Sequence, residues 1–242
     1  MTRAKGIRGL LPLMMAAAGG LIAGGGAVAL AAPQPSADKA AVEQIVRDYI
    51  LNNPEIIPEA MQRLQAREMA KAIGTHRPAL ETPFEGAWAG HEKGDVTLVM
   101  FSDYACGYCR RAAPDVDRLL AEDKKLKVVF RELPILGPES ETAARAALNA
   151  ARQGRYLDFH RRMFAERSTS GDSVAAVSKA SGVSGHTATD GAVDQEIANN
   201  IAMARALGMT GTPTFIVGDQ ILQGAVGYEA LKKAVADARS GV

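Results

Sequence analysis

Apolar residues follow two different spacings along this chain, and together they predict a mixed α/β fold. Val96–Phe101 is a mainly apolar run that suits a strand buried on both faces, and Leu126–Phe130 is a second such run. Between them we expect a helix that contains Cys106 near its start. The inner side of this helix would carry three apolar residues, Val116, Leu119 and Leu120. Strand, helix and strand then form one βαβ unit.

Two short strands and a helix are predicted for the last part of the chain. Pro213–Val217 and Ile221–Gly224 suit paired strands around the turn Gly218-Asp219. Tyr228–Ala238 suits a closing helix. These elements add a ββα unit after the βαβ unit.

The stretch between the two units is predicted to be helical. Glu139–Leu207 is rich in alanine, with breaks expected at Gly154, Gly171 and Gly182–Gly185. The order βαβ, helical block, ββα is typical of a thioredoxin-like fold. We therefore expect an α/β domain over residues 83–242, with a helical insertion at about residues 138–207.

Residues 32–82 are predicted to form an N-terminal helical segment and a linker. A first helix from Asp38 should end before Pro54, because the residue ahead of a proline resists the α conformation. A second helix is expected to start near Pro58 and run toward Ile73, with Met61 and Leu64 turned inward. His76–Glu92 contains two prolines and two glycines and indicates a linker or an irregular approach to the next domain.

Two interpretations of these helices stay open. The first helix carries an apolar stripe at helical spacing, formed by Val42, Ile45, Val46, Tyr49 and Ile50. Such stripes can pack onto the domain that follows, or they can pair between subunits and build a homo-oligomer through residues 38–73.

Residues 1–31 have the features of a signal peptide. Basic residues at Arg3, Lys5 and Arg8 precede the uncharged, mostly apolar stretch Gly9–Leu30, and Ala29-Leu30-Ala31 offers a cleavage site. An uncleaved membrane anchor is the alternative, since the apolar stretch is long enough to span a bilayer. The glycines and the cleavage pattern favour removal, so we expect a periplasmic or otherwise exported protein.

Composition narrows the choice of function. The 242 residues carry a formal net charge of only +1, which does not point to nucleic acid as a partner. There are two cysteines, too few for a small fold held together by disulfides. A zinc site would need two more ligands, and the four histidines lie far from the cysteines in sequence.

The two cysteines form the motif Cys106-Gly107-Tyr108-Cys109 between a predicted strand and a predicted helix. Thiol–disulfide exchange needs a thiolate that attacks a disulfide and a second thiol that resolves the mixed disulfide. A free cysteine, with a pKa near 8.5, is only about 3% ionised at pH 7, and a helix N-terminus stabilises its thiolate. We therefore expect Cys106 to be the nucleophile and Cys109 the resolving thiol, with no cofactor required.

A Cys-x-x-Cys motif can also have other roles. It can be half of a zinc site, but the other half is missing here. It can bind Cu(I), an ion that soft thiolates favour. It can be a structural disulfide, although a bridge across one helical turn closes almost no loop and stabilises little.

Four stretches of the chain resemble the DsbA-like branch of the thioredoxin superfamily over about residues 90–235. They are Gly94–Val99, Asp103–Cys109, Arg131–Gly137 and Gly211–Val217. Tyr49–Glu55 also resembles the leader helix of the ScsC (suppressor of copper sensitivity) subgroup, in which the leader can build oligomers. The resemblance implies protein substrates with thiols or disulfides and a membrane partner that resets the cysteines.

The resemblance also implies further site residues. The family's cis proline maps onto Pro213, preceded by Thr212, whose backbone would pair with an extended substrate; a trans proline at a strand start is the alternative. Gly107 and Tyr108 would contact the substrate as well. Many relatives carry a buried acid six residues before the first cysteine, where this chain has Met100. Water, Asp103 or Glu132 could handle the proton instead, and the sequence does not choose among them.

The direction of the reaction is the last question that the sequence raises. Gly107-Tyr108 between the cysteines, with Thr212 before Pro213, resembles disulfide isomerases more than oxidases. We therefore expect an isomerase or reductase. A DsbA-like oxidase and a Cu(I)-binding protein are the alternatives, and a glutathione-dependent isomerase is disfavoured because such proteins usually lack the second cysteine.

Overall fold

The computed structural model describes residues 38–185 and 191–241, and these divide into two bodies. The first body ends at Asn53 and its described part is helix α1 (Lys39–Asn52). The second body begins at Pro54 and holds all other elements. The predicted signal peptide lies outside the described residues. Within the part of the chain that is described, no helix is both long enough and apolar enough to cross a bilayer.

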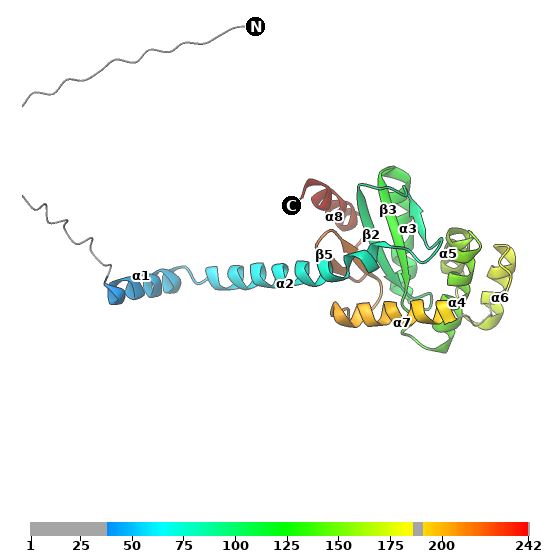
Figure 1. Ribbon diagram of the computed structural model, residues 1–242, viewed down its shortest axis with the longest axis horizontal. Coiled ribbons are helices and arrows are strands. Elements are labelled where there is room, and N and C mark those ends of the chain that lie inside the picture. The colour runs from blue at the N-terminus through cyan, green and yellow to red at the C-terminus, as the bar shows by residue number, and fades with distance from the viewer. Residues whose placement is uncertain (1–37, 186–190, 242) are drawn as a thin grey trace, which may run out of the picture. The chain divides into compact units, whose positions relative to one another are not determined.

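A five-stranded sheet in the order β1-β3-β2-β4-β5 forms the centre of the second body (Figure 1). The strands are β1 (Trp88–Gly90), β2 (Val96–Ser102), β3 (Leu126–Glu132), β4 (Thr214–Val217) and β5 (Gln220–Gln223). β2 and β3 run parallel, as a βαβ unit requires, and the other pairs are antiparallel. The predicted α/β thioredoxin-like fold is confirmed.

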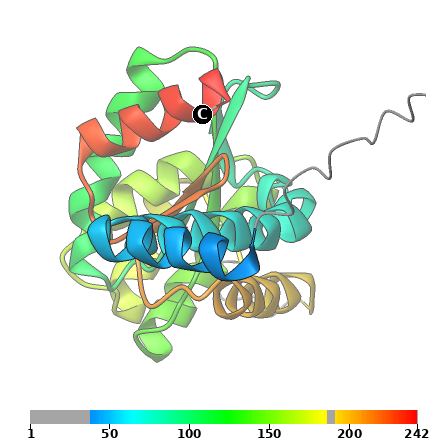
Figure 2. The same ribbon diagram turned by 90° about the vertical axis from the view of Figure 1, so that its left-hand side faces the viewer.

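Side-chain alternation along the two central strands gives the sheet two covered faces. Leu98 and Met100 of β2 lie in one core together with α3 (Gly107–Glu122), α5 (Tyr156–Ala165) and α8 (Tyr228–Ser240). Val99 and Phe101 lie in a second core with α2 (Ile56–Glu81) and α7 (Gly191–Ala206). In Figure 2, α8 in red and α7 in gold lie on opposite sides of the sheet.

The helical insertion between β3 and β4 consists of α4 (Pro138–Arg152), α5, α6 (Gly171–Ala180) and α7. Gly154 separates α4 from α5 with a φ of 66°, a conformation that favours glycine. Ser170 caps the start of α6 by accepting a hydrogen bond from the Ser173 backbone. The predicted insertion is therefore confirmed.

The prediction of a linker or irregular approach over His76–Glu92 holds only in part: residues 82–87 are irregular, but the residues before them are helical and Trp88–Gly90 is a strand. Helix α2 continues to Glu81 with Pro78 inside it, and β1 follows as an edge strand on β3. Ile73 and Leu80 explain the continuation, because both are buried against the second core and hold the helix to the sheet.

The prediction that Met61 and Leu64 turn inward was wrong, since these residues are 51% and 43% exposed. In α1 no residue is buried. The apolar stripe of α1 and the first half of α2 therefore lie open to solvent.

Arg131 holds the C-terminal end of α2 on the sheet. Its guanidinium donates hydrogen bonds to the carbonyl oxygens of Ala79, Leu80 and Thr82, and it pairs with Glu196 at 2.5 Å. The last carbonyls of a helix have no partner within the helix and carry a partial negative charge, so a buried cation satisfies both needs.

Replacing Arg131 should therefore destabilise the protein. Arg131→Met leaves Glu196 and several carbonyls without their donor, and we expect a loss of about 3 kcal/mol in the free energy of unfolding, measured by urea denaturation. Arg63→Met is the matched control, because Arg63 forms an exposed ion pair with Glu59 and should cost less than about 1 kcal/mol. Equal effects of the two substitutions would contradict the role given to Arg131.

Candidate functional site

Cys106 lies at the point where strand β2 gives way to helix α3. It is the N-cap residue of α3, with extended backbone angles, and the helix begins at Gly107. The first N–H groups of a helix have no partner within it, so this position exposes the sulfur to free donors and to the positive end of the helix dipole. The predicted strand-then-helix setting of the cysteine pair is confirmed.

The carboxylate of Asp103 fixes the turn that leads into α3. One oxygen accepts a hydrogen bond from the Ala105 backbone N–H at 2.8 Å. The other accepts from Ile135 at 2.9 Å and Leu136 at 3.1 Å, in the loop after β3. Asp103 is buried, and both of its oxygens are engaged in holding these two loops together. It was one of three candidates for handling the proton, and its contacts indicate a positioning role instead.

Thr212 and Pro213 lie beside Cys106, although more than a hundred residues separate them in sequence. The Thr212-Pro213 peptide bond is cis, which confirms that expectation. β4 starts one residue later and pairs with the end of β2, Thr214 opposite Phe101. This pairing brings the Cys106 Sγ to 3.2 Å from the Thr212 carbonyl oxygen.

The two sulfurs have opposite electrostatic environments. Burial alone would raise the pKa of Cys106, but hydrogen bonds with Thr212 and from the Cys109 and Tyr108 backbones outweigh it, and the pKa is lowered. Burial raises the pKa of Cys109 well above its ordinary value. Both cysteines are free thiols, so the structure describes the reduced form. Cys106 is thus suited to attack and Cys109 to stay protonated.

Apolar and small residues are exposed in the segments that adjoin Cys106. Gly107 is exposed and 60% of Tyr108 is exposed, while Arg111 stacks over the Tyr108 ring at 4.2 Å. Ile135 and Leu136, held by Asp103, are exposed as well.

Behind the cysteines lies a buried polar cluster on the first-core face of the sheet. Glu132, at the end of β3, accepts hydrogen bonds from the hydroxyls of Tyr104 at 3.1 Å and Tyr156 at 2.6 Å. The Tyr104 hydroxyl also lies 3.0 Å from Nδ1 of His160. All four residues are buried. Sequence reasoning named Glu132 but missed Tyr156 and His160, because nothing in their own segment shows that α5 packs there.

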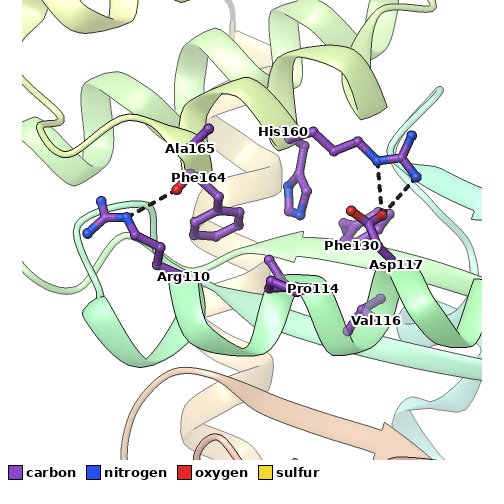
Figure 3. Close-up of a pocket in the computed structure, with 10 residues that line it drawn as sticks. Arg110, Pro114, Val116, Asp117, Phe130, His160, Phe164 and Ala165 are labelled. Atoms are coloured by element: carbon purple, nitrogen blue, oxygen red, sulfur yellow. Dashed lines mark hydrogen bonds and ion pairs between the residues drawn. The ribbon is translucent and has the colours of Figure 1, made fainter. Parts of the chain in front are cut away.

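Next to this cluster a pocket of about 180 Å³ opens between α3 and α5 (Figure 3). His160, Phe130 and Phe164 line it, and Asp117 pairs with Arg161 at 2.8 Å at its edge. Arg110 donates a hydrogen bond to the Phe164 carbonyl and so links α3 to α5. Across the described residues, no group of three or more His, Cys, Asp or Glu could hold a metal ion.

Comparison with protein families agrees with this geometry. A family model described as "DSBA-like thioredoxin domain" matches residues 97–236. The chain belongs to this family. Its N-terminal residues 38–71 match a second description, "Copper resistance protein ScsC N-terminal domain". In this DSBA-like chain the matched residues include the Cys106–Cys109 pair at the start of α3.

Solved structures of this architecture come from several bacteria. A linker-deletion mutant of Proteus mirabilis ScsC is 29% identical, with a TM-score of 0.69, over 88% of this DSBA-like chain and 100% of that chain. A structure described as a periplasmic thioredoxin-like protein of Salmonella enterica serovar Typhimurium is 28% identical, with a TM-score of 0.64, over 68% and 95%.

Part of the DSBA-like chain also resembles a segment of much longer proteins. A protein named Na(+)/H(+) antiporter NhaA 1, from Salinispora arenicola, is 31% identical over 161 residues, which is 63% of this chain and 24% of that protein. The chain thus spans about a quarter of the length of the curated relatives it matches first.

The buried carboxyl of Glu132 should make stability depend on pH. Burial raises the pKa of Glu132 to about 8 in the folded state, against 4.5 ordinarily. Between these values the unfolded chain releases a proton that the folded chain keeps, so stability falls as pH rises, by at most about 1.4 kcal/mol per pH unit. Glu132→Gln, a neutral side chain of the same shape, should remove this fall.

Thermal unfolding of both proteins from pH 4.5 to 8.5 checks the prediction. The stability of the Glu132→Gln protein relative to the parent chain should increase steadily as pH rises. Parallel curves over that window would show that Glu132 is ionised in the fold.

Proposed function

We propose that this chain is an exported protein thiol–disulfide oxidoreductase that works as a disulfide isomerase or reductase. The observation that carries the proposal is the unequal pair of sulfurs: Cys106 at the start of α3 with a lowered pKa, and Cys109 one turn later with a raised one. Such a pair attacks with one sulfur and keeps the other in reserve.

The reaction runs in two exchanges. The Cys106 thiolate attacks a substrate disulfide, forms a mixed disulfide and releases one substrate sulfur as a thiolate. If that thiolate or another on the substrate attacks the mixed disulfide, the substrate is isomerised and Cys106 is regenerated. If Cys109 attacks instead, the substrate is reduced and the Cys106–Cys109 disulfide forms.

Thr212 and Pro213 are proposed to bind the substrate backbone next to the reacting sulfur. Thr212 is half-buried at the start of β4 and lies beside Cys106, where an extended peptide can add to the loop in the manner of a strand. Gly107 and Tyr108 are proposed to complete this surface. An exposed aromatic ring beside a glycine can contact apolar side chains of a partly unfolded protein without blocking its backbone.

The isomerase direction rests on the dipeptide Gly107-Tyr108 and on Thr212 before the cis proline. The alternative is an oxidase of the DsbA kind, which would need a reduced form stable enough to make the disulfide strongly oxidising. Cu(I) binding by the two thiols is a further alternative, favoured by the match of residues 38–71 to a family named for copper resistance.

Export and assembly complete the proposal. The basic and apolar features of residues 1–31 support a cleaved signal peptide, and one structural relative is described as periplasmic. A membrane protein would then restore the redox state of the cysteines. The exposed apolar stripe of α1 and of the first half of α2 supports a homo-oligomer of this chain through residues 38–73.

Removing the attacking sulfur should abolish the reaction. We expect Cys106→Ser to lose insulin reduction and the refolding of scrambled ribonuclease by at least about a hundredfold, because no other thiolate lies at the helix start. Iodoacetamide at pH 7 should alkylate Cys106 of the parent protein faster than free cysteine. A Cys106→Ser protein with full activity would refute the proposal.

Cys109→Ser is the matched control and separates the two directions. An isomerase can release its substrate without Cys109, so this variant should keep some refolding of scrambled ribonuclease while insulin reduction is lost. A redox titration gives a second test. A potential near about −180 mV supports isomerisation, and one near about −120 mV supports the oxidase.

The oligomer is tested by charging the apolar stripe. Ile45 is 68% exposed on α1, and Ile45→Asp should convert the oligomer into a monomer in light scattering. Gln44→Asp, at the neighbouring exposed position, should leave the oligomer intact. A parent protein that is already monomeric at micromolar concentration would contradict the assembly.

A further inference from the structure

Cys109 needs a group that takes its proton and gives it back. To resolve a mixed disulfide, its thiol must ionise while wholly buried, and burial raises its pKa. Met100, six residues before Cys106, ends in a thioether, which cannot accept that proton. The proton must therefore go to another group near the sulfur.

The register of the two central strands places an acid close to Met100. Met100 lies opposite Phe130, and Ser102 lies opposite Glu132, in the parallel pair of β2 and β3. Because every second side chain of a strand points to the same face, Glu132 shares its face with Phe130 and with Met100. Glu132 therefore lies on the strand next to that of Met100 and two positions further along, toward the end of the sheet where α3 begins.

The contacts of Glu132 fit a carboxyl that carries a proton in the resting protein. Its Oε1 accepts hydrogen bonds from Tyr104 and Tyr156, while its Oε2 is buried with no hydrogen-bond partner among the described residues. An ionised carboxylate with a bare oxygen in an apolar core is costly, and protonation removes that cost.

Tyr104 connects this carboxyl to the cysteines. It belongs to the loop two residues before Cys106, and its hydroxyl bonds Glu132. Tyr104 and Cys109 are both buried in the first core. Burial, then the charge of Glu132, and last the charge of Cys109, raise the pKa of Tyr104.

His160 connects the same hydroxyl to the surface pocket. Its Nδ1 lies 3.0 Å from the Tyr104 oxygen, and its ring lines the pocket between α3 and α5 (Figure 3). Burial lowers the pKa of His160 to about 3, so the imidazole is neutral. Since Tyr104 donates to Glu132, the imidazole proton sits on Nδ1 and is donated to the Tyr104 oxygen. Hydrogen bonds thus run from Glu132 to a cavity that solvent can enter.

The other charged groups around the cluster act elsewhere. Arg131, next to Glu132 in sequence, points to the opposite face of the sheet and pairs with Glu196. The titratable groups around Glu132 are Asp103 and Tyr104 before α3, Cys109 on α3 by way of Tyr104, and Tyr156 and His160 on α5. On α7, the neutral Asn200 donates to the Glu132 carbonyl.

We infer that Glu132 is the proton reservoir of Cys109, reached through the Tyr104 hydroxyl and exchanged with solvent along His160. This inference rests on the proposed function. In the resolving step Glu132 first releases its proton to solvent, and its carboxylate then takes the proton of Cys109. The Cys109 thiolate attacks Cys106 Sγ, the Cys106–Cys109 bond forms, and the substrate sulfur leaves with the electron pair of the broken bond. In reverse, the Glu132 carboxyl returns a proton to Cys109 as it leaves.

The resolving step can be isolated with glutathione disulfide as the probe. The reduced full chain is mixed with a large excess of it, samples are quenched with acid, and mass spectrometry follows the decay of the Cys106–glutathione adduct from pH 5 to 10. We expect the decay rate to rise with pH and level off near 8, because Glu132 accepts a proton only when ionised and burial raises its pKa to about 8.

Glu132→Gln should remove that plateau. The rate at pH 8 should fall about a hundredfold, the lower end of the effect that a general base supplies, and should then follow hydroxide up to pH 10. Formation of the adduct, which needs only Cys106, should not change. A plateau near pH 8 that survives in Glu132→Gln overturns the inference.

Two tyrosine-to-phenylalanine variants test the inference even if Glu132→Gln does not fold. Tyr156→Phe removes a hydrogen bond that lowers the pKa of Glu132, so the plateau should begin at higher pH with its height unchanged. Tyr104→Phe breaks the connection and should lower the plateau several-fold. The opposite result, a lower plateau in Tyr156→Phe alone, overturns the inference.

Failure of this inference can be told apart from failure of the proposed function. If neither the parent chain nor any variant forms the glutathione adduct, the role given to Cys106 is wrong, and both the proposed function and this inference fail. If the adduct forms and decays with the parent pH profile in Glu132→Gln, only the proton reservoir is wrong.

Discussion

The reactivity of the cysteine pair depends on the start of helix α3. One turn of helix separates two sulfurs whose surroundings favour opposite charge states: free N–H groups for Cys106 and an apolar core for Cys109. Each unit of difference in pKa corresponds to about 1.4 kcal/mol, so small changes in the position of this helix end would alter the chemistry strongly. The Asp103 carboxylate fixes that position by binding both adjoining loops.

Much of the fold could be predicted because its central strands are buried on both faces. Val96–Phe101 and Leu126–Phe130 carry this signal within a few residues each. Strand β1 could not be predicted, because three residues show no periodicity and its pairing partner β3 lies far along the chain. The course of α2 through Pro78 was missed for a related reason, since buried contacts and the Arg131 guanidinium hold a segment whose local sequence favours a break.

The candidate site divides in the same way. The cysteine pair and Thr212-Pro213 are local motifs, and the sequence indicated both. Tyr156 and His160 belong to a different helix from any motif, and only the packing of α5 against β3 brings Tyr156 to Glu132 and His160 to Tyr104. Helical periodicity revealed an apolar stripe around Ile45 and Met61, but periodicity does not say what covers a stripe, and nothing in the described part of the chain buries these residues.

The helical insertion has a consequence for how relatives of this protein can diverge. β4 returns to pair directly with β2, so the distance between Cys106 and Thr212 is set by the sheet and tolerates changes in insertion length. α5, however, supplies Tyr156 to the buried carboxyl of Glu132 and His160 to the hydroxyl of Tyr104. Substitutions in α5 can therefore change the pKa of Glu132 while the spacing of Cys106 and Thr212 stays the same. The rate of the reaction and the binding of the substrate can thus evolve separately.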